Sequence, residues 1–118
     1  MATIKSYTDI DQSKKLSEIL PIKSADMYYW CGEDLRIGGH KAMDIDYDIP
    51  CWSLAALLNI LPEINGIPLK VEKVKAQDGY DGYYYHIEYE GIVLIPYSKN
   101  LVDACVAMIE NLHELKML

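Results

Sequence analysis

The sequence predicts an α+β fold in which three helices pack on one small antiparallel sheet, as a single pair of layers. Residues 100 to 116 repeat apolar side chains in steps of three and four, the period of an amphipathic helix. Residues 69 to 95 alternate apolar and polar side chains between turn residues, which is typical of a β-meander. The chain has 118 residues, 51% apolar and 25% charged, as in globular domains. We therefore expect residues 1–118 to form a single domain.

The first predicted helix covers residues 8 to 20. Thr8 offers a hydroxyl for the N-cap, and Asp9 and Asp11 suit the positive end of the helix dipole. Pro21 ends the pattern.

The second predicted helix covers residues 51 to 61, between Pro50 and Pro62. From Leu54 onward its only polar residue is Asn59. A helix that is apolar nearly all round is expected to be buried.

Two strands are predicted between the first two helices. Residues 27 to 30 have the aromatic content of a strand. Residues 43 to 49 alternate apolar side chains with Asp44, Asp46 and Asp48, which predicts a half-exposed strand with a row of acids outside.

The predicted meander has strands at 69 to 76, 83 to 90 and 92 to 95, with a loop at 77 to 82 and a tight turn at Glu90-Gly91. Its middle strand has two distinct faces. One face carries Tyr83, Tyr85, Ile87 and Tyr89, and the other carries Tyr84, His86, Glu88 and Glu90.

The third helix, residues 100 to 116, has a capping residue in Asn100 with Asp103 three positions later. Its apolar stripe is expected to pack on the sheet or on the central helix. That stripe consists of Leu101, Cys105, Met108, Leu112 and Leu115.

Composition argues against two classes of partner. The net charge of −7 and the pI of about 4.8 disfavour binding to nucleic-acid phosphates. The sequence has no apolar run near the ~20 residues of a membrane span and no visible secretory signal. We expect a cytoplasmic protein that binds neither nucleic acid nor membrane. Residues 24 to 50 carry −4 of the net charge, so an acidic inhibitor that mimics nucleic acid stays an alternative.

The sequence predicts no metal site and no cofactor. The acids of 44 to 48 resemble the opening of a calcium loop, but Ile49 stands where Gly is needed and Ala55 where Glu is needed. The cysteines and histidines lack the usual ligand spacings. They are Cys31, Cys51, Cys105, His40, His86 and His113.

Cys51 is a candidate nucleophile. It lies at the start of the second predicted helix, where the dipole can stabilise a thiolate. His86 follows on a strand, with Glu88 on the same face, in the layout of papain-like and cell-wall-type cysteine peptidases. The surroundings of Cys51 are not rich in Gly or Ser, and no third orienting residue is evident. A buried structural thiol is the favoured reading, and a cysteine-dependent hydrolase is the alternative.

The candidate binding residues lie in the middle of the chain. Tyrosine suits binding surfaces because it joins apolar area to a hydroxyl at low entropic cost. Tyr80 in the loop and Tyr84 on the outer strand face are the best placed of the ten tyrosines. The acids Asp44, Asp46 and Asp48 are further candidate binding residues.

Three segments resemble a family of short, uncharacterised proteins from gut anaerobic bacteria and their phages or mobile elements. They are residues 7–20 (YTDIDQSKKLSEIL), 50–62 (PCWSLAALLNILP) and 100–118 (NLVDACVAMIENLHELKML). The resemblance implies no activity, substrate or catalytic residue, but it suggests an accessory protein of a mobile element. Taken with the composition, we expect a small non-enzymatic protein–protein interaction module, with a homodimer as one form of it.

Overall fold

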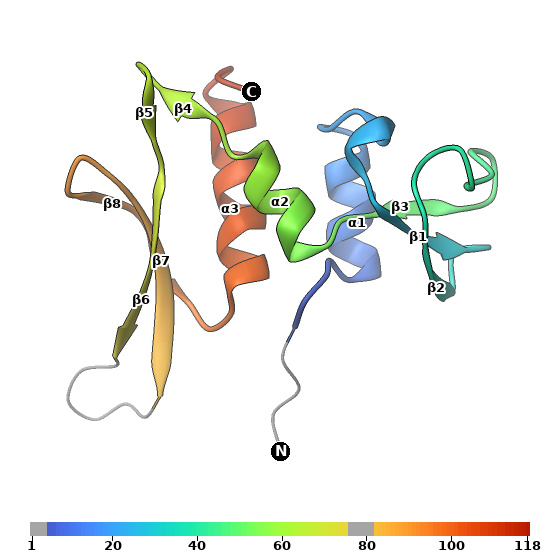
Figure 1. Ribbon diagram of the computed structural model, residues 1–118, viewed down its shortest axis with the longest axis horizontal. Coiled ribbons are helices and arrows are strands. Elements are labelled where there is room, and N and C mark those ends of the chain that lie inside the picture. Colours follow the sequence, from blue (N-terminus) through green and yellow to red (C-terminus); the bar gives the residue numbers. More distant parts are fainter. Residues whose placement is uncertain (1–4, 76–81) are drawn as a thin grey trace. The chain divides into compact units, whose positions relative to one another are not determined.

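The computed structural model describes residues 5–75 and 82–118 and confirms the α+β class (Figure 1). In these ranges it has three α-helices and antiparallel sheets of three, two and three strands. Three sheets replace the single sheet expected. The chain divides into two compact units, here called the N-terminal unit (residues 5–60) and the C-terminal unit (the described residues of 61–118). Each is described by itself, and the single domain stays a prediction.

The N-terminal unit combines two α-helices and a short 3-10 helix with one three-stranded sheet, in the order β2-β1-β3. Strand β1 lies in the middle and is antiparallel to both neighbours. The elements are α1 (Ile10–Ser17), a short 3-10 helix (Ile22–Ser24), β1 (Met27–Trp30), β2 (Asp34–Ile37), β3 (Ile49–Cys51) and α2 (Leu54–Ile60).

Helix α1 is shorter than predicted, and Asp9 rather than Thr8 is its N-cap. Asp9 and Gln12 form a capping box, in which each side chain accepts a hydrogen bond from the other's backbone N–H. The Thr8 hydroxyl does not cap the helix, because Oγ1 accepts a hydrogen bond from the Trp52 N–H and lies 2.8 Å from Ser13 Oγ. The Thr8 side chain is fully buried.

The predicted strand at 43 to 49 is wrong, because most of this segment is a turn and only Ile49 enters β3. The Asp44 carbonyl accepts hydrogen bonds from the backbone N–H groups of Tyr47 and Asp48. Aspartate side chains that bond to nearby backbone compete with a strand's ladder, and alternation of residue types cannot reveal this. The acids therefore do not form the outer face of a strand.

Helix α2 begins at Leu54, three residues later than predicted, because Cys51 pairs with Met27 in the sheet. Ser53 Oγ accepts a hydrogen bond from the Ala56 N–H at the helix start. The expectation of a wholly buried helix is also wrong, since Leu57 is the one buried residue of α2.

The C-terminal unit contains the predicted meander, with sheet order β6-β7-β8, and a separate two-stranded hairpin. The predicted loop at 77 to 82 falls almost entirely outside the described residues. The elements are β4 (Glu63–Ile64), β5 (Ile67–Pro68), β6 (Lys70–Lys75), β7 (Tyr83–Tyr89), β8 (Ile92–Ser98) and α3 (Leu101–Glu114).

Helix α3 covers one face of the meander and confirms the third predicted helix (Figure 1). Asn100 is its N-cap, as expected, and accepts a hydrogen bond from the Asp103 N–H at 2.8 Å. Leu115, expected in the apolar stripe, is exposed. The core between helix and sheet consists of Ile87, Ile95, Ala104, Met108 and Leu112. Because β7 alternates, the side chains that flank Ile87 lie on the opposite face.

Candidate functional site

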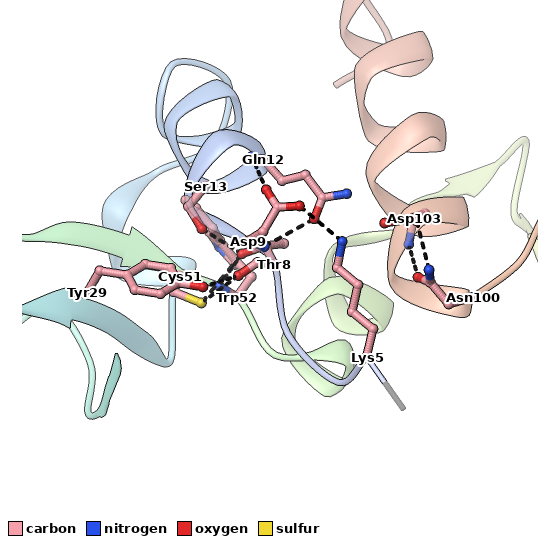
Figure 2. A network of polar contacts seen from close by, with 10 residues as sticks. All are labelled: Lys5, Thr8, Asp9, Gln12, Ser13, Tyr29, Cys51, Trp52, Asn100 and Asp103. Atoms are coloured by element: carbon pink, nitrogen blue, oxygen red, sulfur yellow. Dashed lines mark hydrogen bonds and ion pairs between the residues drawn. The ribbon is translucent and has the colours of Figure 1, made fainter. Parts of the chain in front are cut away.

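Cys51 lies in a buried polar network where β3 meets the start of α1 (Figure 2). Its Sγ is 3.4 Å from the Thr8 carbonyl oxygen and 3.5 Å from Thr8 Oγ1. Thr8 Oγ1 is also 2.8 Å from Ser13 Oγ and accepts a hydrogen bond from the Trp52 N–H. The Tyr29 hydroxyl donates to the Thr8 carbonyl at 2.7 Å. Thr8 is thus the centre of the network.

Burial sets the chemistry of this thiol. Desolvation raises the pKa of Cys51, and hydrogen bonds from the Thr8, Ser13 and Tyr29 side chains only partly offset it. Cys51 is therefore a neutral thiol near pH 7, whereas nucleophilic cysteines need a stabilised thiolate. Among the described residues no buried side-chain nitrogen or oxygen lacks a hydrogen-bond partner. The network satisfies its own polar groups and joins two elements.

The geometry does not meet the requirements of the hydrolase alternative. Cys51 has no exposed surface, and it lies in a strand rather than at a helix N-terminus. His86 belongs to the other unit and forms its contacts with Glu72 and Glu88.

A second feature is the turn at residues 44 to 48, here called the Asp turn. The Asp48 carboxylate accepts hydrogen bonds from the backbone N–H groups of Cys31 and Asp44, both at 2.8 Å. Asp44 Oδ1 accepts a third from the Asp46 N–H at 3.0 Å. Asp48 is buried, whereas Asp44 and Asp46 are exposed. Asp48 therefore adds no exposed charge to those of Asp44 and Asp46.

The Asp turn directs two apolar side chains to solvent. Ile45 is 72% exposed and Tyr47 is 70% exposed. Beside them lies an open pocket of about 410 Å³, within the size range of small-ligand sites. Its walls come from α1, the 3-10 helix, the Asp turn and β3, and consist of Lys14, Ser17, Ile22, Ile45, Asp48, Ile49 and Pro50.

A third feature is a charged cluster on the face of β6 and β7 that lies opposite the Ile87 side chain. Register places Glu72 directly across from His86, and Lys70 across from Glu88. His86 Nε2 is 3.0 Å from Glu72 Oε2 and 3.4 Å from Glu88 Oε2. Lys70 Nζ is 3.5 Å from Glu72 Oε2 and 3.3 Å from Glu88 Oε1.

Neighbouring groups in this cluster shift the pKa values of Glu72 and Lys70 in favour of their charged forms. The hydrogen bond with His86, followed by the attraction of Lys70, lowers the pKa of Glu72. The hydrogen bond to Glu88, followed by the charge of Glu72, raises the pKa of Lys70. Both carboxylates therefore have a cation or a hydrogen-bond donor within reach.

Of the predicted tyrosines, Tyr84 lies on the face of this cluster and is half-buried, opposite Val74. Tyr80 lies outside the described residues.

Sequence reasoning missed Glu72, Lys70 and Lys14. The first two join His86 only through the register of β6 on β7, which the spacing along the chain does not reveal. Alternation on β6 was the one available signal, since it puts Lys70 and Glu72 on a common face.

Comparison with protein-family models, curated proteins and solved structures finds no match for this chain. The resemblance of the three segments to proteins of gut bacteria and their phages stays an expectation. Among the described residues no helix is both long and apolar enough to cross a membrane.

Proposed function

We propose that this protein is a non-enzymatic protein–protein interaction module that binds its partner at the Asp turn and the adjoining pocket. The observation that carries the proposal is the display of Ile45 and Tyr47 on a turn fixed by the Asp48 carboxylate. Binding becomes more favourable when a partner covers exposed apolar side chains, because this removes apolar surface from water. A turn already held in one shape loses little entropy on binding.

The pocket indicates the chemistry of the partner. Ile22, Ile45, Ile49 and Pro50 offer apolar contact to an aliphatic side chain. Lys14 lines the same pocket and forms no ion pair within the described ranges 5–75 and 82–118. We expect a protein segment that presents an aliphatic side chain next to a carboxylate.

The enclosure of Cys51 supports a non-enzymatic role, because it leaves the hydrolase alternative without an accessible nucleophile. The role as an accessory protein of a phage or mobile element rests on the sequence resemblance alone. We also propose a cytoplasmic location, which is consistent with three thiols that form no disulfide.

Affinity capture with quantitative mass spectrometry tests the proposal. The wild-type chain should enrich a partner that Ile45→Asp loses, because an aspartate in the pocket wall repels a carboxylate and removes apolar area. Ile92→Asp is the matched control, since Ile92 is 65% exposed and belongs to the other unit. A partner captured equally by both variants would exclude the Asp turn as the binding surface.

Solution mass, measured by sedimentation, tests whether the partner is a second copy of the chain. A dimer that Ile45→Asp dissociates and Ile92→Asp leaves intact would identify a homodimer through this surface. A monomer under all conditions leaves a different protein as the partner.

A further inference from the structure

The charged cluster on β6 and β7 contains a set of atoms that suits a metal ion. One ligand atom from each of Glu72, His86 and Glu88 can be chosen so that all lie within 4.8 Å of one another. These residues come from two antiparallel strands whose register sets them side by side. Because strands are rigid, the set does not depend on a loop for its shape.

Two of the distances between the ligand atoms are close to those of a tetrahedral site. Zinc bound at 2.0 to 2.2 Å by nitrogen and oxygen ligands has neighbouring ligands about 3.3 to 3.6 Å apart. His86 Nε2 is already 3.0 Å from one carboxylate oxygen and 3.4 Å from the other. The two carboxylate oxygens of the set lie within 4.8 Å of each other, so rotation of the carboxylate groups would bring them closer around a metal ion.

The surroundings also suit a cation. The His86 and Glu88 side chains are 16% and 15% exposed, so water competes for them less than at an open surface. Two carboxylates held this close repel each other unless a positive charge lies between them. A dication would balance both.

We propose that Glu72, His86 and Glu88 bind a zinc ion, with a fourth position left for water or another ligand. One imidazole and two carboxylates form a ligand set of the kind that zinc accepts, and three protein ligands are typical of open zinc sites. Zinc also binds such ligands more tightly than manganese or iron(II) does. The inference is independent of the Asp turn, which belongs to the other unit.

Lys70 competes with the metal ion for the two carboxylates. It shares Glu72 Oε2 with His86, but it reaches Glu88 through the other oxygen, Oε1. Zinc would therefore displace Lys70 from Glu72, whereas Lys70 can stay on Glu88. Since both are cations, Lys70 weakens zinc binding and helps set its strength.

Calorimetric titration of the full chain with zinc chloride tests the proposal. Cys31→Ser serves as the background, because Cys31 is exposed and its thiol could bind zinc. One zinc ion should bind per chain. Glu72→Gln should weaken binding by about tenfold or more, and His86→Ala should weaken it further. Lys70→Met should strengthen it.

His113→Ala is the matched control, because His113 is an exposed histidine outside the cluster. Cobalt(II) gives a second readout, since a tetrahedral site of nitrogen and oxygen ligands absorbs visible light without a thiolate charge-transfer band. Circular dichroism checks that each variant folds, and Glu72→Gln preserves side-chain size if His86→Ala does not fold. Absence of saturable zinc binding, or binding unchanged by Glu72→Gln, would overturn the proposal.

Discussion

Asp48 differs from its neighbouring acids because its carboxylate accepts hydrogen bonds from two backbone N–H groups. One belongs to Cys31, after β1, and the other to Asp44, so the side chain ties the Asp turn to the end of a strand. Asp46 has the same chemistry but lies exposed at the tip. The role of each acid is set by which backbone donors reach it.

The first prediction concerns this difference. Asp48→Ala should lower the free energy of unfolding by about 2 kcal/mol, because two backbone donors lose a charged acceptor. Asp46→Ala, its control, should change it by less than about 0.5 kcal/mol. Urea unfolding measures both. Equal effects would show that Asp48 does not hold the turn.

The second prediction concerns stability at high pH. Burial raises the pKa of Cys105 from 9.0 to about 12, and it also raises the pKa of Cys51. The unfolded chain loses these protons from about pH 9 while the folded chain keeps them, so the stability from both thiols is complete below pH 9 and falls above it. For Cys105 it is lost as pH rises toward 12. Each thiol can contribute a loss of up to about 1.4 kcal/mol per pH unit.

Denaturant unfolding at several pH values from 8 to 11 measures the slope. Cys105→Ala should make this slope shallower, whatever stability that variant loses at neutral pH. An unchanged slope in Cys105→Ala would mean that this thiol titrates normally in the folded protein.

At the scale of elements, two hairpins turn through the same geometry with different residues. Asn65-Gly66 joins β4 to β5, and Glu90-Gly91 joins β7 to β8. All four residues have positive φ, between 49° and 80°, as a type I′ turn requires. Asparagine adopts this conformation readily, whereas glutamate does not.

The third prediction follows from that comparison. Glu90→Asn should raise the free energy of unfolding by about 1 kcal/mol, because it removes an unfavourable left-handed residue from the turn. Asn65→Glu should lower it by a similar amount. Thermal unfolding measures both, and a loss of stability in Glu90→Asn would contradict this account of the turn.

At the scale of the whole molecule, the three cysteines have different surroundings despite similar chemistry. Cys31 is exposed in a turn, whereas Cys51 is enclosed by the Thr8 network and Cys105 by the buried face of α3. The accessibility of Cys51 therefore reports whether the N-terminal unit is folded, and that of Cys105 whether the C-terminal unit is folded.

The fourth prediction uses these thiols. A soluble thiol reagent should modify Cys31 rapidly in the native protein and Cys51 and Cys105 only on unfolding, because the reactive sulfur must be accessible. Mass spectrometry of digested samples locates each modification over time. Rapid modification of Cys51 would remove the case for its enclosure and revive its candidacy as a nucleophile.

Local patterns predicted the α+β class, helix α3 with its Asn100 cap, the meander and the turn at Glu90-Gly91. Each depends on residues close together in the sequence, so periodicity and turn chemistry suffice. The same reasoning failed for residues 43 to 49, because alternation does not show that Asp48 reaches the backbone of Cys31. It also failed at Cys51, where pairing with Met27 in the sheet overrode helix propensity.

The sequence by itself determined the class, the acidic charge and the elements whose signals are local. Only the tertiary structure decided which side chains meet. In the folded protein Cys51 is buried against Thr8, and the Asp48 carboxylate accepts a hydrogen bond from the Cys31 backbone. The register of two strands places Glu72 across from His86. The physical reason is that burial and strand register depend on residues distant in the chain, and both decide whether a polar group serves as scaffold or is free to act.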